Sequence, residues 1–236
     1  MKPRKVHLIW ILALPLLACH AQSQDALRGH VELTKAGHRL KDASHAVVWL
    51  TPVGNSVDMP KQTRIPQLVQ KNKSFQPSLL VIPAGGKVEF PNHDPFFHNV
   101  FSLFEGKRFD LGLYESGSTR FVQFDKPGIS FIFCNIHAEM SAVVIAVTTP
   151  YYAISDARGD VAIPDVPPGR YQLRLFHSAV APDALRAMTR EITVGPGQTN
   201  LGTFTLSESD VTTAHKNKYG RDYDRPEPDS PAYARP

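Results

Sequence analysis

Three residues with metal-binding side chains lie near the middle of the chain at intervals of three: Cys134, His137 and Met140. A thiolate and a thioether are soft donors that suit Cu(I), whereas an imidazole accepts copper in either oxidation state. A fourth donor is expected from His98, which lies 36 residues upstream of Cys134. Two imidazoles and a thiolate in one plane, with a weak axial Met, form a type 1 (blue) copper site. The pattern therefore predicts a mononuclear copper site made of these four residues.

The same residues have a plainer interpretation as a buried cysteine with a surface histidine and a core methionine as chance neighbours. A single cysteine often packs as a small hydrophobic side chain. However, Cys134 is the one thiol that remains if export removes or modifies Cys19. A free thiol in an oxidising compartment is prone to disulfide exchange, which a bound metal prevents. The cysteine count thus favours the metal-binding interpretation.

The first residues have the order of a bacterial export signal. A basic start precedes residues 8–18, an apolar stretch too short to cross a bilayer comfortably. We expect residues 1–21 to be a signal peptide and the mature protein to be exported to the periplasm. Residues 16–19 also resemble a lipobox, which would make Cys19 a lipid anchor. Ordinary cleavage after Ala21 is the competing interpretation.

Charge and motifs limit the remaining function classes. The formal net charge is +4, and removal of the signal peptide lowers it to +1, because that stretch holds three basic residues and no acidic one. The basic residues form no patch, so we expect no nucleic-acid partner. The chain has no HxH pair of the kind that multinuclear copper oxidases use, and no Ser-His-Asp context suggests a hydrolase. We therefore expect no catalytic residues and no enzyme.

Hydrophobic residues alternate, or run in short stretches, along most of the chain, and this pattern indicates β-strands. Many short strands at regular spacing predict an all-β protein built from sandwiches. One short helix is expected within residues 181–190. Residues 51–73 are polar and poorly periodic, so we expect a linker there. Residues 207–236 are rich in charged residues and proline, and we expect them to be a disordered tail.

Several segments around the candidate ligands carry a further pattern: PAGGKVEF at 83–90, Asn92, HNV at 98–100, DKPG at 125–128 and the loop 134–140. With these segments the chain resembles the cupredoxins over residues 75–147, and its short ligand loop is most similar to that of the amicyanins. The resemblance implies a Greek-key β-sandwich over residues 70–149 with copper at one end.

By the same resemblance His98, Cys134 and His137 are the equatorial copper ligands and Met140 is the axial one. Asn99 is implied to be a residue outside the ligand set whose side chain ties the two ligand loops together. Amicyanin loops carry prolines between their ligands, whereas this loop has Asn135, Ile136, Ala138 and Glu139. The loop's stiffness and the copper potential are therefore not implied.

The flanks have turn-rich motifs within residues 29–50 and 155–171. They resemble the two halves of a carboxypeptidase regulatory-like domain, which is a transthyretin-like β-sandwich. The implied halves are residues 25–60 and 150–206, so that the cupredoxin domain is inserted in, or flanked by, a second sandwich. The whole chain is also similar to exported bacterial proteins labelled methylamine utilization protein.

Together, the residues and the resemblances predict a blue copper protein that passes one electron between a redox protein donor and an acceptor in the cell envelope. One alternative is a copper-binding or copper-delivery protein without a redox role. Another is a metal-free recognition module of the envelope. Five further histidines lack ligand spacing and are expected to be surface, turn or hydrogen-bonded residues: His30, His38, His45, His93 and His177.

Overall fold

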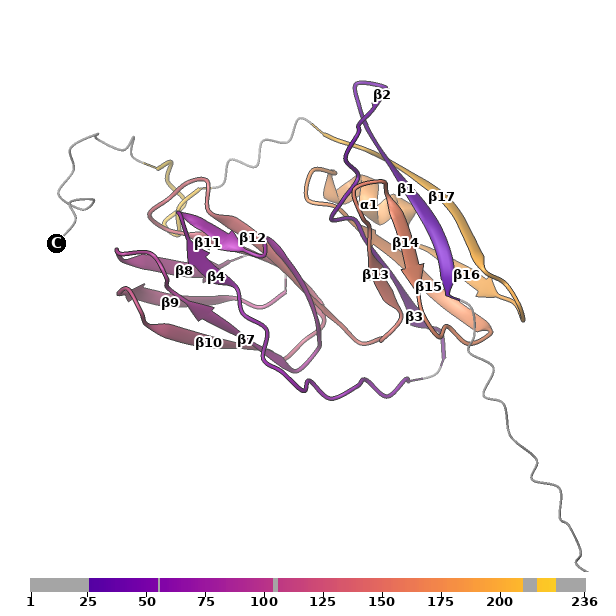
Figure 1. Cartoon of the computed structure of the whole chain (residues 1–236), viewed down its shortest axis with the longest axis horizontal. Helices are drawn as coiled ribbons and strands as arrows, with labels where there is room; N and C mark the ends of the chain where they lie inside the picture. Colours follow the sequence, from indigo (N-terminus) through magenta and orange to yellow (C-terminus); the bar gives the residue numbers. More distant parts are fainter. Residues whose placement is uncertain (1–25, 55, 104–105, 210–215, 224–236) are drawn as a thin grey trace, which may run out of the picture.

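The computed structural model describes residues 26–54, 56–103, 106–209 and 216–223 (Figure 1). Within these ranges the chain is almost entirely β-structure, with one α-helix, α1 (Pro182–Met188). The predicted all-β fold is confirmed, and α1 lies within the segment expected to be helical. The predicted signal peptide, including Cys19, lies outside the described residues. Over the described ranges, no helix is long and apolar enough to cross a membrane.

The strands follow one another along the whole described chain. In order they are β1 (Leu27–Lys35), β2 (His38–Arg39), β3 (Val47–Pro52), β4 (Val69–Lys71), β5 (Ser74–Gln76), β6 (Leu79–Pro83), β7 (Gly86–Pro91), β8 (His98–Ser102), β9 (Phe109–Tyr114), β10 (Thr119–Phe124), β11 (Gly128–Cys134), β12 (Ser141–Val147), β13 (Tyr152–Ile154), β14 (Asp160–Ile163), β15 (Gly169–Phe176), β16 (Arg190–Val194) and β17 (Asn200–Ser207).

The two ends of the strand order come together in one unit, which we call the flanking sandwich. Its first sheet has the order β14-β1-β17, in which β1 is antiparallel to β14 and parallel to β17. Its second sheet has the order β13-β3-β15-β16 and is antiparallel throughout. Inward side chains of both sheets share one apolar core that includes Val31, Leu50, Leu173 and Phe204. The chain leaves this sandwich after β3 and returns to it at β13.

Strands β4 to β12 form a second unit, which we call the central sandwich (Figure 1). Five of its strands pair in the order β6-β12-β11-β8-β9, while β10 pairs with β7 and β4 with β5. Its core contains large buried side chains such as Phe90, Tyr114 and Ile132, and also Cys134 and Met140. Because β8 lies beside β11, the start of one strand meets the end of the other at one end of the sheet.

Strand β12 faces two cores at once, which explains why its sequence does not alternate. Its side chains at 142, 144 and 146 pack in the core of the central sandwich, whereas those at 143, 145 and 147 pack against the flanking sandwich. The rings of Phe131 on β11 and Phe176 on β15 also meet between the two sandwiches, with centroids 6.1 Å apart. A continuous apolar run is typical of a strand buried on both faces.

Residues 51–73 differ from the linker that the sequence predicts, because their second half belongs to the central sandwich. Leu68 and Gln70 are fully buried, and Gln70 bridges in parallel to Asn92. The side chain of Gln70 also hydrogen-bonds the hydroxyl of Tyr114 in the core. The sequence pattern did not indicate that this segment is buried, because its polar residues are buried through hydrogen bonds and show no apolar periodicity.

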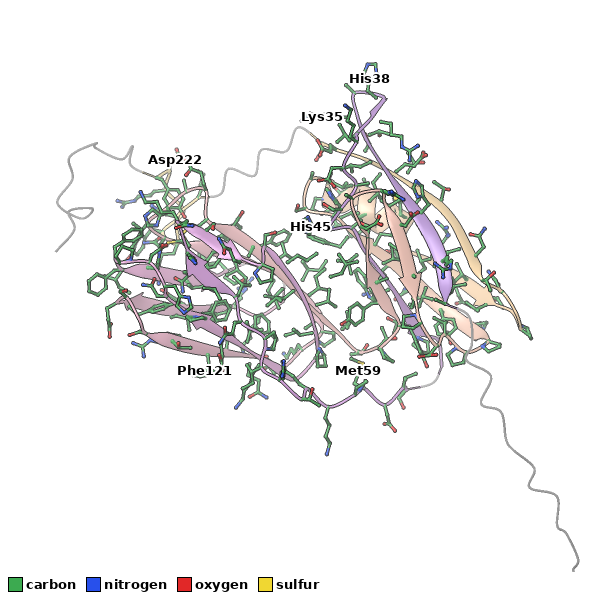
Figure 2. All side chains as sticks on the ribbon, viewed as in Figure 1. Lys35, His38, His45, Met59, Phe121 and Asp222 are labelled. Atoms are coloured by element: carbon green, nitrogen blue, oxygen red, sulfur yellow. The ribbon has the colours of Figure 1, made fainter. Side chains whose placement is uncertain are left out.

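The tail expected from residue 207 onward also differs in its described parts. Ser207 ends β17, and residues 216–223 form a turn at one end of the central sandwich, where Figure 2 labels Asp222. The remainder of the predicted tail lies outside the described residues.

Candidate metal centre

Two neighbouring strands carry the first two candidate ligands to one end of the central sandwich. β8 begins at His98 and β11 ends at Cys134. The strands are antiparallel, and Cys134 pairs with Val100, two residues beyond His98. Alternate residues of a strand point to the same face of a sheet. His98 and Cys134 therefore point to the same face, which is the inner one.

The loop from Cys134 to Met140 brings His137 back toward the same point. The backbone N–H of Cys134 donates to the carbonyl of Met140 (3.2 Å), and the N–H of Met140 donates to the carbonyl of His137 (3.1 Å). The N–H of Asn135 donates to the carbonyl of Asn99 (3.1 Å), which joins the loop to β8. These bonds close the loop into a tight turn and determine where the imidazole of His137 lies.

The three side chains converge in a way that suits a single metal ion. The Nδ1 atoms of His98 and His137 lie 3.6 Å and 3.7 Å from the Sγ atom of Cys134, and the three donor atoms all lie within 4.8 Å of one another. With metal–sulfur and metal–nitrogen bonds of about 2.3 Å and about 2.0 Å, trigonal to tetrahedral angles separate sulfur from nitrogen by about 3.5–3.7 Å. The observed separations match this range, and two imidazoles with one thiolate are the equatorial set of type 1 copper.

Asp94 contacts a candidate ligand, and the sequence pattern misses it. Its Oδ2 atom lies 2.8 Å from the Nε2 atom of His98, and both side chains are almost completely buried. When Nε2–H donates to this carboxylate, Nδ1 keeps its lone pair and directs it toward Cys134. The one signal in the sequence is an acidic residue four positions before the histidine, in a turn otherwise marked by Pro95.

The β4–β5 hairpin holds Asp94 in place. The backbone N–H of Asn72 donates to Oδ1 of Asp94 (2.6 Å), and the N–H of Lys73 donates to Oδ2 (3.0 Å). Asn72 and Lys73 both have positive φ, 55° and 54°, a conformation that asparagine adopts more readily than most residues. It directs two successive N–H groups at one carboxylate. A segment expected to be a linker thus supports a candidate ligand.

One aromatic ring, that of Phe96, packs against both candidate imidazole ligands. The centroid of the Phe96 ring lies 5.2 Å from that of His98 and 5.6 Å from that of His137. His98 and Cys134 are fully buried, and His137 is only 7% exposed, so it is less accessible than a surface ligand. Phe97, next to Phe96, is 52% exposed. The donor side chains are therefore shielded from solvent, and the residue before His98 presents an apolar ring at the surface.

Burial keeps both imidazoles neutral near pH 7. It lowers the pKa of His98, although the hydrogen bond to Asp94 opposes the shift, and it lowers the pKa of His137 to about 4. Burial also raises the pKa of the Cys134 thiol, against the effect of nearby backbone N–H groups that hydrogen-bond the sulfur. Neutral imidazoles accept a metal directly, whereas the thiol must first release its proton.

The carboxyl group of Asp94 stays charged despite its burial. Burial alone raises its pKa, but hydrogen bonds from the N–H of Lys73, from His98 and from the N–H of Asn72 outweigh this effect, so the pKa lies below its ordinary value. A buried carboxylate that hydrogen-bonds a metal-binding imidazole increases the basicity of that imidazole as a ligand.

Asn99 differs in part from its expected role. Its side-chain Nδ2 donates to Oδ1 of Asp110 (2.6 Å) and to the carbonyl of Gly112 (2.8 Å), both on β9. The tie to the ligand loop comes instead from its backbone carbonyl, which accepts from Asn135. The physical reason is that Asn99 lies within the β8–β9 ladder, paired with Leu113, so its side chain meets polar groups of β9.

Met140, the predicted axial ligand, is fully buried in the same core as Cys134. Its backbone closes the ligand loop, as described above. The coordination of a metal by its thioether stays a prediction.

No family model matches the chain, and no curated protein sequence matches it. Solved structures that resemble part of it include a purple cupredoxin from Nitrosopumilus maritimus, with 22% identity over 35% of this chain and 99% of that chain and a TM-score of 0.32. A reduced amicyanin variant has 14% identity over 44% of this chain and 99% of that chain, with a TM-score of 0.34.

A copper-containing nitrite reductase from Thermus scotoductus SA-01 has 24% identity over 42% of this chain, but over only 26% of the reductase, with a TM-score of 0.35. These structural neighbours are copper proteins, but TM-scores this low carry no functional argument. The functional conclusion below therefore depends on the geometry of the site, since function belongs to sites rather than to folds.

Proposed function

We propose that this protein is a periplasmic type 1 copper protein that transfers single electrons without substrate turnover. The observation that carries the proposal is the convergence of two imidazole Nδ1 atoms on the Cys134 sulfur, at 3.6 Å and 3.7 Å. His98, Cys134 and His137 would hold the ion, with Met140 as a fourth, axial donor. Copper bound by these residues would supply a one-electron couple between Cu(I) and Cu(II).

The chain's own residues prepare the site before any metal binds. Asp94 fixes the orientation of His98 through Nε2, and the loop hydrogen bonds fix Cys134 and His137. The burial of all three side chains excludes water from the donors. A donor set that the protein holds rigidly changes little when the charge at the site changes, and this keeps reorganisation small.

We further propose that the central sandwich is a cupredoxin domain set within a carboxypeptidase regulatory-like sandwich. The sequence motifs of the flanks and the return of the chain to the flanking sandwich at β13 support this arrangement. Redox proteins of the cell envelope would be the electron donor and acceptor. Phe97 and Leu113, which are 52% and 61% exposed near the site, offer an apolar contact surface for them. Lipidation at Cys19 would anchor the protein to a membrane.

The visible absorption spectrum during titration with Cu(II), followed by ascorbate and then ferricyanide, tests the copper proposal. We expect an intense thiolate-to-copper band at one equivalent, which disappears with ascorbate and returns with ferricyanide while elemental analysis shows that copper is retained. Loss of copper on reduction would indicate a delivery protein instead. The absence of both band and copper would contradict the proposal and favour a metal-free recognition module.

A further inference from the structure

The polar segment Lys216–Tyr223 lies at the candidate metal site, although it is more than 75 residues beyond the ligand loop in sequence. We call it the C-terminal strap. It holds its own shape: the N–H of Asn217 donates to the carbonyl of Arg221, and the N–H of Gly220 donates to the carbonyl of Asn217, both at 2.9 Å. Gly220 adopts a φ of 74°, which suits a tight turn at glycine. The strap is therefore a compact turn.

Two residues of the C-terminal strap, Lys218 and Tyr223, bind the ligand loop. The backbone N–H of Lys218 donates to the side-chain Oδ1 of Asn135 at 2.9 Å. The hydroxyl of Tyr223 donates to the backbone carbonyl of Cys134 at 2.6 Å. These two acceptors belong to adjacent residues, one of which is the candidate thiolate ligand. The strap is thus hydrogen-bonded to the loop at the point where β11 ends.

A partly buried ion pair extends this contact toward the other ligand strand. The Nζ of Lys218 lies 2.8 Å from Oδ2 of Asp110, and the lysine side chain is only 21% exposed. The other oxygen of Asp110 accepts from the Nδ2 of Asn99, the residue next to His98. One lysine therefore connects the strap to the loop through its N–H and to the β8–β9 ladder through its ammonium group.

The ligand loop has little stiffness of its own beyond its hydrogen bonds. Between Cys134 and Met140 there is no proline, and in the described chain Cys134 is a free cysteine with no disulfide nearby to brace the turn. The carbonyl of Cys134 and the amide oxygen of Asn135 accept from the strap rather than from the loop. The bonds that the strap makes are thus additional to those that close the loop.

We propose that the C-terminal strap fixes the ligand loop from outside, so that Lys218 and Tyr223 are positioning residues that restrict access to Cys134 and slow the exchange of a metal held there. The restriction of the thiol requires only the metal-free fold. The slowing of metal exchange rests on the proposed copper function.

The rate at which Cys134 of the metal-free chain reacts with 5,5′-dithiobis(2-nitrobenzoate) tests the first part. The full chain carries Cys19→Ser, so that Cys134 is its one thiol. Tyr223→Phe removes one hydrogen bond and should raise the rate about fivefold, the factor that corresponds to a net hydrogen bond. Lys218→Met removes the ion pair and should raise it by about the same factor, and deletion of residues 216–236 should raise it more than about tenfold.

Tyr219→Phe is the matched control. Tyr219 is 70% exposed, and its side chain interacts with the ammonium of Lys218 at the surface of the strap. Its rate should stay within about twofold of that of the parent. The proposal is overturned if the deletion leaves the rate within twofold of the parent, or if Tyr219→Phe raises it as much as Tyr223→Phe does. If circular dichroism shows that the deletion variant is unfolded, the rates of Tyr223→Phe and Lys218→Met alone test the proposal.

A second readout addresses the metal. In the copper-loaded chain, Tyr223→Phe and Lys218→Met should release Cu(I) to bathocuproine disulfonate about fivefold faster than the parent, and Tyr219→Phe should match the parent. Equal release rates in all four proteins would overturn this part. A parent chain that takes up no copper would contradict the proposed function, while the thiol rates would still confirm or overturn the strap.

Discussion

The two sandwiches each bury histidine, but in different ways. In the flanking sandwich, His177 is 8% exposed, and both of its ring nitrogens are satisfied by backbone: Nε2 donates to the carbonyl of Ser44 and Nδ1 accepts from the N–H of Ala179, both at 3.2 Å. In the central sandwich, His98 and His137 direct Nδ1 at a thiol sulfur. Burial alone thus does not identify a ligand. The direction of the remaining lone pair, and the softness of the atom that it faces, distinguish the two cases.

The contacts among buried side chains also differ between the two sandwiches. The flanking core is apolar and consists of side chains that fill space between two sheets. The buried polar side chains of the flanking sandwich, such as Ser155 and His177, hydrogen-bond backbone groups, whereas in the central sandwich Asp94 pairs with His98 and Gln70 with Tyr114 through their side chains. Buried polar groups cost stability unless they are paired. Asp94 and its partner His98 lie at the end of the central sandwich where the candidate ligands converge.

The largest expected effect follows from removal of the thiolate. Cys134→Ala should abolish the intense visible band with Cu(II) completely, because that band needs sulfur bound to copper. The metal-free variant should stay folded, with a change in unfolding free energy below about 2 kcal/mol, because few atoms are removed. Absorption and urea titration measure the two quantities. His93→Ala, at an exposed histidine of the same sandwich, should keep the band. Loss of the band in this control variant would contradict the assignment of the ligands.

A packing change in the flanking sandwich should lower the stability of the fold but leave the copper band unchanged. Phe204 is 1% exposed in its core, and Phe204→Ala should lower the unfolding free energy by about 3–5 kcal/mol. The copper band of the folded variant should stay unchanged, because no supporting contact of the site involves β17. Phe121→Ala, at a phenylalanine that is 57% exposed, should change stability by about 0.5 kcal/mol or less. A changed copper spectrum in the Phe204 variant would show that the two regions are coupled.

Asp94→Asn tests the carboxylate that orients His98. The substitution removes a buried negative charge from Nε2 of the imidazole, and we expect copper affinity to fall about 10–100-fold. Competition with a chelator of known affinity measures the change. Asp125→Asn, at an exposed acid that pairs with Lys107 in the same sandwich, is the matched control and should leave affinity within about threefold. Equal copper affinities for the parent and the Asp94 variant would contradict a role for Asp94 in supporting the site.

The stability of the metal-free chain should depend on pH through its buried histidines. The pKa of His137 is lowered to about 4 in the fold and lies near 6.5 when unfolded. The unfolded chain therefore binds more protons below about pH 6.5, so stability is present above that pH and falls as the pH drops. Between about pH 6.5 and 5 His137 should account for roughly 1–2 kcal/mol. Urea titrations of the parent and of His137→Gln should give a shallower fall in the variant; identical slopes would contradict the buried neutral state.

The smallest effect is expected for the predicted axial ligand. Met140→Leu conserves volume at a fully buried position and should change stability by less than about 1.5 kcal/mol. The variant should keep copper and show a raised reduction potential, because a weak axial donor tunes the couple without holding the ion. Voltammetry and absorption measure the two properties. If both stayed as in the parent, Met140 would be a packing residue like those of the flanking core.

The parts that the sequence predicts are the local ones. Cys134, His137 and Met140 lie within one short loop, so their spacing alone groups them, and alternation along the strands predicts the all-β fold. His98 lies far from this loop in sequence. Grouping it with Cys134 therefore requires the further inference that the strand starting at His98 lies beside the strand ending at Cys134. The helix α1 was indicated by a short run between two strands of the flanking sandwich.

The parts that escape prediction depend on polar contacts between distant residues. The N–H groups that hold Asp94 come from a hairpin 21 and 22 residues earlier, in a segment whose polarity suggested a linker. Tyr223 reaches the carbonyl of Cys134 across 89 residues, from a stretch whose composition predicts disorder. Composition reports how much apolar surface a segment can bury, but it does not report which backbone groups a few polar side chains will meet.

X-ray absorption at the copper K edge of the loaded protein, oxidised and then reduced, tests the central claim most directly. We expect one sulfur at short distance and two imidazole nitrogens around copper in both oxidation states, and loss of the short sulfur distance in Cys134→Ala, because the axial thioether bond is long and weak. A shell of nitrogen and oxygen alone, or a sulfur that is bound in only one oxidation state, would contradict a type 1 electron-transfer site.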